Sequence, residues 1–247
     1  MSLIEFQRAL ADMVASPALT RAVRSGDDKA LARYELLPGE RARLRTVASQ
    51  PGMEVSCTLY RANRLTPVVM LLPYTCFVLG ERMKSIAERF WDDSRTDLQF
   101  RSEIERFAAF LRELVQAGEL DEPLLEEVLD FELATNELRF LPRRQLAEQA
   151  ESSAGDRLRL HPLVRIVHFR HEPRELLARL AAMTPPPYDL PEGDFPLVLT
   201  ATGEELGVRQ VDTRLARLLE SLDERAALAT EDADLLVDEG LAVRVER

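Results

Sequence analysis

The spacing of the apolar residues changes part-way along the chain, and this change constrains the fold more than any other feature. Through roughly the first 150 residues, apolar side chains recur every three or four positions, as on the buried face of a helix. The segments "HPLVRIVHFRH" and "LVLTATGEELGVRQVD" instead alternate with the period of a β-strand. This order predicts an α+β protein, with an N-terminal helical bundle followed by a small domain that contains a sheet.

Amphipathic helices are predicted throughout the first region. The apolar stripe of the first helix consists of Leu3, Phe6, Leu10 and Met13. Two short helices are expected around Pro38-Gly39, the second ending at Pro51-Gly52, because Pro and Gly interrupt helices. Pro67 and Pro73 predict either two helices or one kinked helix in the most apolar segment, since each proline removes a backbone donor.

A polar segment, "AEQAESSAGDR" at residues 147–157, separates the two patterns. Such Ser- and Gly-containing stretches are typical of loops between domains. The sequence therefore predicts a helical domain over residues 1–150 and a second domain over residues 156–247.

The second domain has the element order of a winged helix. A strand, a short helix and a stiff proline-rich loop come first, and a hairpin, two helices and a last strand follow. The corresponding ranges are 161–171, 172–183, 184–196, 197–212, 213–222, 231–240 and 241–246. We therefore expect a winged-helix-like domain built on a β-hairpin or a three-stranded sheet.

Charge argues against the usual role of a winged helix, which is to place a helix in the DNA major groove. The whole chain has a net charge of −11, and only Lys29 and Lys84 are lysines. The candidate recognition helix, "TEDADLLVDEG", has five acidic residues and no basic one. Because DNA binding needs positive charge against the phosphates, we expect no nucleic-acid partner. A DNA-binding transcription regulator remains the alternative interpretation.

The same layout also suits peptide binding. An unpaired sheet edge can accept an extended segment as an additional strand, and a neighbouring helix can supply pockets for its side chains. We expect the strand "LGVRQV" and the last helix to form this site. Its candidate residues are Leu206, Gly207, Val208, Arg209, Val211, Leu235 and Leu236. Arg165, Arg170 and Arg209 are candidates for pairing with acidic residues of the peptide.

Two longer stretches carry a resemblance to known families. "PLVLTATGEELGVRQVDTRLARLLESLDERAAL", followed by "LLVDEGLAV", resembles the winged-helix precursor-recognition domains of peptide natural-product pathways. "CTLYRANRLTPVVMLLPYTCFVLGERMKSIAERFW" resembles the partner subunits of multinuclear non-haem iron oxidases that modify cysteine in ribosomally made peptides. The arrangement is most similar to the partner of the carbon-excising oxidase in the 3-thiaglutamate pathway.

The resemblance implies a non-catalytic partner subunit. Such a protein would bind a leader or carrier peptide by strand addition and present the cysteine-bearing end to the oxidase. Iron would belong to the oxidase, with no cofactor in this chain. The segment "YRANR" supplies candidate residues for docking on the oxidase, which are Tyr60, Arg61, Asn63 and Arg64.

The residues themselves indicate no catalytic or metal site. The sequence has only three histidines, His161, His168 and His171, and the last two are three apart on a predicted strand, so their side chains point to opposite faces. No P-loop, H-E-x-x-H or G-x-S-x-G motif is present. An enzyme in its own right is therefore the less favoured hypothesis.

The two cysteines, Cys57 and Cys76, form no C-x-x-C pair and are expected to be free thiols. The longest apolar run is interrupted by Pro73 and is shorter than a membrane span. The N-terminus lacks the basic and apolar regions of a signal peptide. We therefore expect a cytoplasmic protein with no membrane partner.

Overall fold

The computed structural model describes residues 3–93, 99–151, 157–187, 189–203, 205–222 and 230–245. The predicted α+β class is confirmed: helices predominate, and the strands form two small sheets. The chain divides into two compact units, Met1–Leu120 and Asp121–Arg247. This division differs from the boundary expected near residue 150, for a reason that lies in helix α8.

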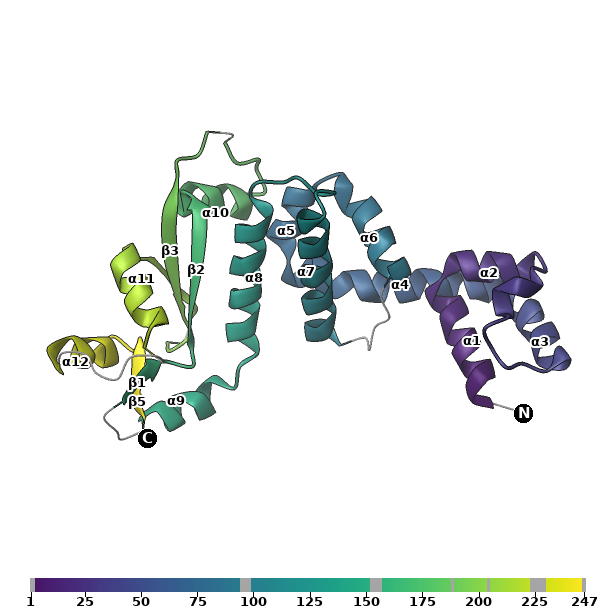
Figure 1. The fold of residues 1–247 in the computed structure, drawn as a ribbon, viewed down its shortest axis with the longest axis horizontal. Helices are drawn as coiled ribbons and strands as arrows, with labels where there is room; N and C mark the ends of the chain where they lie inside the picture. Colours follow the sequence, from purple (N-terminus) through teal and green to yellow (C-terminus); the bar gives the residue numbers. More distant parts are fainter. Residues whose placement is uncertain are drawn as a thin grey trace. The chain divides into compact units, whose positions relative to one another are not determined.

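The first unit is helical (Figure 1). Its elements are α1 (Leu3–Ala15), α2 (Pro17–Arg24), the short 3-10 helix η1 (Asp28–Leu31), α3 (Pro38–Ala48), α4 (Pro51–Leu71), α5 (Pro73–Leu79), α6 (Arg82–Asp93) and α7 (Phe100–Gln116). Proline occupies the first position of α2, α3, α4 and α5, where its missing N–H costs no helical hydrogen bond. Pro51 thus begins α4, and the helix expected before Pro38 is only the 3-10 turn η1.

The two prolines of the apolar segment have different effects. Pro67 is buried inside α4, which continues through it to Leu71. Pro73 begins α5 after a break at Leu72, where the two helix axes bend by 102°. The prediction of two helices is therefore confirmed, with the break at Pro73. Among the described helices, none is both long and apolar enough to cross a membrane alone, and only the bent pair α4 and α5 meets those criteria together.

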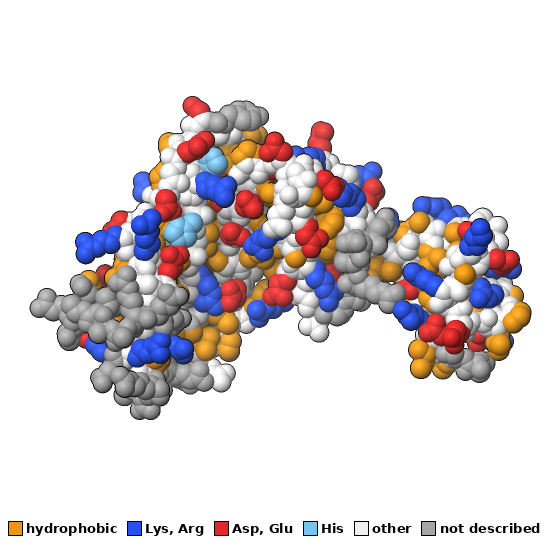
Figure 2. Space-filling model, in the orientation of Figure 1, with side chains coloured by type: hydrophobic (Ala, Val, Ile, Leu, Met, Phe, Trp, Pro, Cys, Tyr) orange, Lys and Arg blue, Asp and Glu red, His pale blue; other side chains and the backbone are white. Residues whose placement is uncertain are grey.

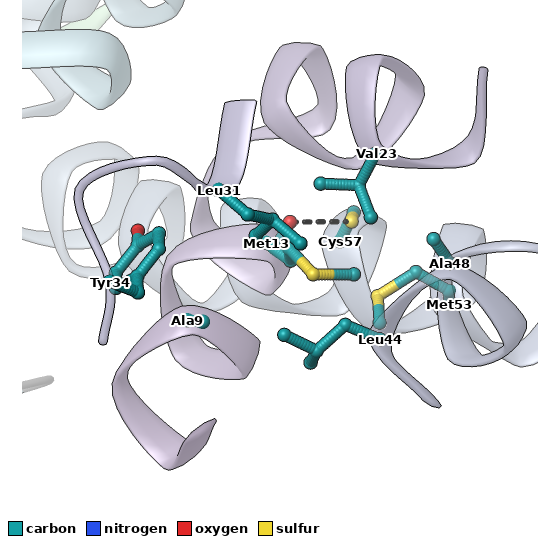
Figure 3. Close-up of a cluster of buried hydrophobic side chains, with 9 residues drawn as sticks. All are labelled: Ala9, Met13, Val23, Leu31, Tyr34, Leu44, Ala48, Met53 and Cys57. Carbon is teal, nitrogen blue, oxygen red and sulfur yellow. Dashed lines mark hydrogen bonds between the residues drawn. The ribbon is translucent and has the colours of Figure 1, made fainter. Parts of the chain in front are cut away.

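Side chains from α1, α2, α3 and the beginning of α4 form one core of the first unit (Figure 3). Its members are Ala9, Met13, Val23, Leu31, Tyr34, Leu44, Ala48, Met53 and Cys57. The Cys57 thiol donates a hydrogen bond to the Met13 carbonyl at 3.5 Å. Cys57 therefore packs as a buried free thiol, as predicted.

The second unit contains helices and strands in turn. They are α8 (Leu125–Phe140), α9 (Arg143–Glu151), β1 (Arg157–Leu160), β2 (Val164–His171), α10 (Pro173–Ala181), β3 (Glu192–Thr200), β4 (Gly207–Gln210), α11 (Thr213–Glu220), α12 (Thr230–Asp238) and β5 (Ala242–Val245). Strands β2, β3 and β4 form an antiparallel sheet in that order, and β1 pairs with β5. The proline-rich loop is shorter than expected because β3 already begins at Glu192.

Helix α8 explains why the second unit begins near residue 121. It lies alongside β2 in Figure 1, and the Phe131 ring packs against Phe169 of β2 with centroids 5.9 Å apart. Glu137 of α8 also forms a bidentate ion pair with Arg165 of β2, with N···O distances of 2.6 and 3.0 Å. The last long helix before the sheet is therefore part of the sheet's own core.

Helices α11 and α12 cover the other face of the sheet. Leu219 and Leu222 at the end of α11, with Leu236 of α12, pack in one cluster with Val164 of β2 and Val198 of β3. Both helices are capped. The Asp212 side chain accepts a hydrogen bond from the Leu215 N–H at 2.8 Å, and Gly240 ends α12 with φ +67°. The hairpin is thus supported by helices on both faces.

Candidate functional site at the outer edge of strand β4

The hydrogen-bond pattern of the hairpin decides which backbone groups of β4 face outward. The Val211 N–H donates to the Pro196 carbonyl at 3.0 Å, and the register pairs Arg209 with Val198 and Gly207 with Thr200. In an antiparallel ladder, hydrogen-bonded and non-hydrogen-bonded pairs alternate. The N–H and C=O groups of Val208 and Gln210 therefore point away from β3. No described strand pairs with this side of β4.

One end of the opposite edge of the sheet is capped by Glu127 of α8. One carboxylate oxygen of Glu127 accepts hydrogen bonds from the Arg170 N–H at 2.6 Å and the His171 N–H at 3.2 Å. The other oxygen lies 2.7 Å from His171 Nδ1. A covered or capped edge cannot add a strand. Glu127 therefore caps one end of the β2 edge, whereas no described strand or capping carboxylate pairs with the outer edge of β4.

The side chains of β4 are exposed, but not all of them are unpaired. Val208 presents an apolar surface to solvent, while Arg209 points to the other face and pairs with Glu239, just beyond α12, at 2.9 Å. Gly240 also lies beside the hairpin, because a Cβ there would be 3.7 Å from Thr202. The end of α12 and the hairpin turn are therefore neighbours, as a peptide groove bordered by that helix requires.

Gly207 has a structural explanation. A Cβ at this position would lie 2.6 Å from the Thr200 hydroxyl oxygen, across the hairpin. A glycine in a strand permits close approach of another group, such as the backbone of a bound peptide. In the structure, the group that approaches Gly207 is the paired strand's own side chain.

The remaining candidate residues divide between surface and core. Leu235 of α12 is 57% exposed, and Leu206 is half-buried beside the turn. Leu236 is only 4% exposed, and Val211 packs against the same cluster. Leu236 therefore stabilises the fold and does not line an accessible groove, which corrects the expectation that both leucines do so.

The candidate docking residues on α4 also differ in exposure. Asn63 is exposed and Tyr60 half-buried, but the Arg64 side chain is completely buried. Its Nε donates to a Glu103 carboxylate oxygen at 2.6 Å, and its guanidinium lies over the Phe90 ring at 4.7 Å. Arg64 is a core residue of the first unit and cannot contact a partner, contrary to the sequence-based expectation.

The arginines expected to bind acidic peptide residues already have carboxylate neighbours. Arg165 is held by Glu137 and Arg209 by Glu239. Arg170 is exposed on β2, with Glu126 at 4.0 Å. Arg165 and Arg170 belong to β2, so neither lies on the β4 edge. A peptide on that edge would be bound mainly through the outward-facing N–H and C=O groups of Val208 and Gln210.

The histidines have structural partners. The His161 Nδ1 accepts a hydrogen bond from the Leu163 N–H at 3.0 Å, and burial lowers the pKa of His161. His168 lies between Asp194 and Glu220, each 2.8 Å from one ring nitrogen. Histidine side chains are visible on the surface in Figure 2, among acidic and basic groups. Among the described residues, no group of three His, Cys, Asp or Glu side chains could hold a metal ion.

The sequence pattern does not identify Glu127, which caps two amides at one end of the β2 edge. Adjacent acidic residues such as Glu126 and Glu127 diverge on a helix, which favours a solvated position for both. In the sequence, Glu127 lies between the apolar pairs Leu124-Leu125 and Val128-Leu129, but its amide partners are more than 40 residues away.

No protein-family model matches the chain, and a search of the curated proteins finds no significant match.

Proposed function

We propose that this chain binds an extended peptide as an additional strand on β4, and that it serves as the non-catalytic partner of a multinuclear iron-dependent oxidase. The peptide would be a ribosomally made precursor whose cysteine-bearing end is presented to the oxidase. The observation that carries the proposal is the accessible β4 edge, where the N–H and C=O groups of Val208 and Gln210 face outward.

The surroundings of this edge support a winged-helix-like recognition domain. The β3–β4 hairpin leads directly into α11 and α12, whose apolar faces pack on the sheet. The end of α12 borders the hairpin through Arg209 and Glu239. A peptide strand on β4 would therefore have the helix end beside it, and exposed Leu235 is available for an apolar side chain.

Such a protein needs no reactive group of its own. Holding one end of a peptide raises the effective concentration of its other end near an enzyme, without tight binding of the reacting residue. The iron chemistry would be supplied by the oxidase. The residues of this chain would contribute main-chain pairing and a docking surface, for which Tyr60, Arg61 and Asn63 remain candidates.

A DNA-binding regulator is the alternative, and the charge of α12 disfavours it. The described helix contains Asp234 and Asp238, within a segment that has no basic residue from Thr230 to Gly240. DNA phosphates would be repelled by this surface. A mobility shift on duplex DNA that weakens with salt would support the alternative and contradict the peptide proposal.

The proposal is tested with a displayed library of short peptides selected on the full chain. The variant Val208→Pro removes one outward-facing donor and leaves the bonds to β3 intact, because proline is tolerated on an edge strand. The matched control, Val208→Thr, keeps the N–H and a branched side chain. Selected peptides should bind wild type and Val208→Thr equally and Val208→Pro about tenfold more weakly. Equal affinity for all three would place the peptide elsewhere.

The second half of the proposal requires a separate measurement. The chain, a multinuclear iron oxidase and its precursor peptide should form a complex in gel filtration, and turnover of the peptide should need both proteins. Full turnover by the oxidase alone would contradict the partner role, even if β4 binds peptides.

A further inference from the structure

A small groove lies between α2 and α4 in the first unit, and no residue of the β4 site lines it. Its volume is about 230 Å³, and α2 and α4 each contribute side chains at helical spacing. Arg21 and Arg24 come from α2, and Glu54, Thr58 and Arg61 come from α4. Residues three or four positions apart lie on the same face of a helix, so each set comes from the helix face that borders the groove.

Positive charge exceeds negative charge in this groove. Arg24 is paired with Glu54 at 2.6 Å, so these two charges offset each other. Arg21 and Arg61 line the same groove, and neither has a carboxylate partner in the part of the chain that the structure describes. Two guanidinium groups therefore share a small concave surface without a compensating anion.

Arg61 gives the second indication of a ligand. Its Nε atom is buried and has no hydrogen-bond acceptor among the described residues. Its guanidinium lies over the Trp91 ring, 5.1 Å from the centroid, which fixes the plane of the group. A buried donor without an acceptor costs about 1–3 kcal/mol, so the Arg61 side chain has hydrogen-bonding capacity that the described part of the chain does not use.

The neutral side chains of the groove add little as donors. The Thr20 hydroxyl donates to the Met13 carbonyl at 2.6 Å, and the Thr58 hydroxyl donates to the Glu54 carbonyl at 3.0 Å. Both protons are already used inside the protein. Recognition in the groove must therefore come from the guanidinium groups, which match the geometry of planar or tetrahedral oxyanions.

We propose that the groove between α2 and α4 is a binding site for an oxyanion, either a phosphate group or a carboxylate. Arg61 and Arg21 donate to the anion from the two helices that border the groove. Arg24 stays with Glu54, which also lines the groove. The volume accommodates a single phosphate or a small dicarboxylate, or one such group at the end of a larger ligand. This site does not depend on the peptide-binding proposal.

The test is isothermal titration of the full chain at low ionic strength, with inorganic phosphate in one arm and succinate in the other. The variants Arg61→Gln and Arg21→Gln each remove one guanidinium from the groove. Arg43→Gln on α3 is the matched control, because Arg43 is an exposed arginine outside the groove. Circular dichroism of each variant shows whether the helices are retained.

Saturable binding of phosphate or succinate is expected, weakened about tenfold or more by Arg61→Gln and by Arg21→Gln, and unchanged by Arg43→Gln. The arm with the tighter binding identifies phosphate or carboxylate as the natural group. If Arg61→Gln loses its helices, Arg21→Gln alone decides the outcome. The proposal is overturned if neither anion binds, or if Arg43→Gln weakens binding as much as the groove variants do.

Discussion

Val208 and Leu199 lie directly opposite each other in the β3–β4 ladder, yet Val208 is 46% exposed and Leu199 is 0% exposed. The sheet is therefore fully covered at β3 and uncovered at β4. The difference follows from the helices, since α8 and α11 pack over β2 and β3 and leave the edge strand accessible.

This asymmetry predicts different costs for two neighbouring substitutions. Leu199→Ala removes fully buried methyl groups and should lower the free energy of unfolding by about 2–5 kcal/mol. Val208→Thr changes an exposed edge position and should cost about 0.5 kcal/mol or less. Urea unfolding of both variants checks this. Similar losses for both would show that Val208 is covered in solution.

The buried pair of Arg64 and Glu103 predicts a coupled effect on stability. Glu103→Gln leaves a buried guanidinium without its carboxylate and should cost about 3–5 kcal/mol. The double variant Arg64→Met with Glu103→Leu should recover much of that loss, because it removes both buried charges. Denaturant unfolding of the single and double variants measures the coupling. Additive losses would contradict a direct pair.

Glu127 predicts a local effect on the β2 edge. Glu127→Gln weakens the acceptor for the Arg170 and His171 amides and should destabilise the second unit by about 1–3 kcal/mol. Amide hydrogen exchange should accelerate at those two residues more than at Val167. Uniform acceleration along β2 would instead indicate global loss of stability.

The position of α8 predicts which fragment folds. A fragment of residues 121–247 retains α8 and should show a cooperative thermal transition. A fragment of residues 156–247 lacks Phe131 and exposes the apolar face of β2, so it should aggregate or unfold. A cooperative transition of the shorter fragment would restore the boundary near residue 150.

His168 predicts a pH-dependent contribution to stability. Burial lowers the pKa of His168, but hydrogen bonds and charges from Asp194 and Glu220 outweigh it and raise the pKa above the usual value of 6.5. Arg217 also faces Asp194, and the hydrogen bond from His168 lowers the Asp194 pKa. The group binds its proton more tightly in the folded state.

The raised pKa of His168 determines how this contribution to stability changes with pH. The stabilisation by His168 is fully present below about pH 6.5 and is lost as the pH rises through the folded pKa. The Asp194 contribution is lost at low pH instead, as its carboxylate protonates. Unfolding free energies of wild type and His168→Gln, measured at about pH 6 and about pH 8, should differ more at the lower pH. The same difference in unfolding free energy at both pH values would exclude a pH-dependent contribution from the contacts of His168 with Asp194 and Glu220.

Much of the fold could be predicted from local patterns. The hairpin turn, the caps at Asp212 and Gly240, and the break at Pro73 depend on residues close in sequence, and all are present. These features follow from backbone chemistry that a few neighbouring residues determine.

The remaining features depend on distant contacts. Arg64 belongs to the "YRANR" segment that the resemblance makes a docking candidate, but in the structure Glu103 pairs with it from 39 positions away. Helix α8 was assigned to the helical bundle because its period does not reveal which partner it packs on. Within the candidate site, the exposed Val208 was predictable from sequence, whereas the burial of Leu236 depends on how α12 packs.

The most direct test of peptide addition is amide hydrogen exchange of the full chain with and without a selected peptide. In the free protein, the Val208 and Gln210 amides should exchange rapidly, while the Arg209 amide, which faces β3, is protected. Bound peptide should slow exchange at Val208 and Gln210 specifically. Unchanged exchange at both residues under saturating peptide would contradict strand addition at β4.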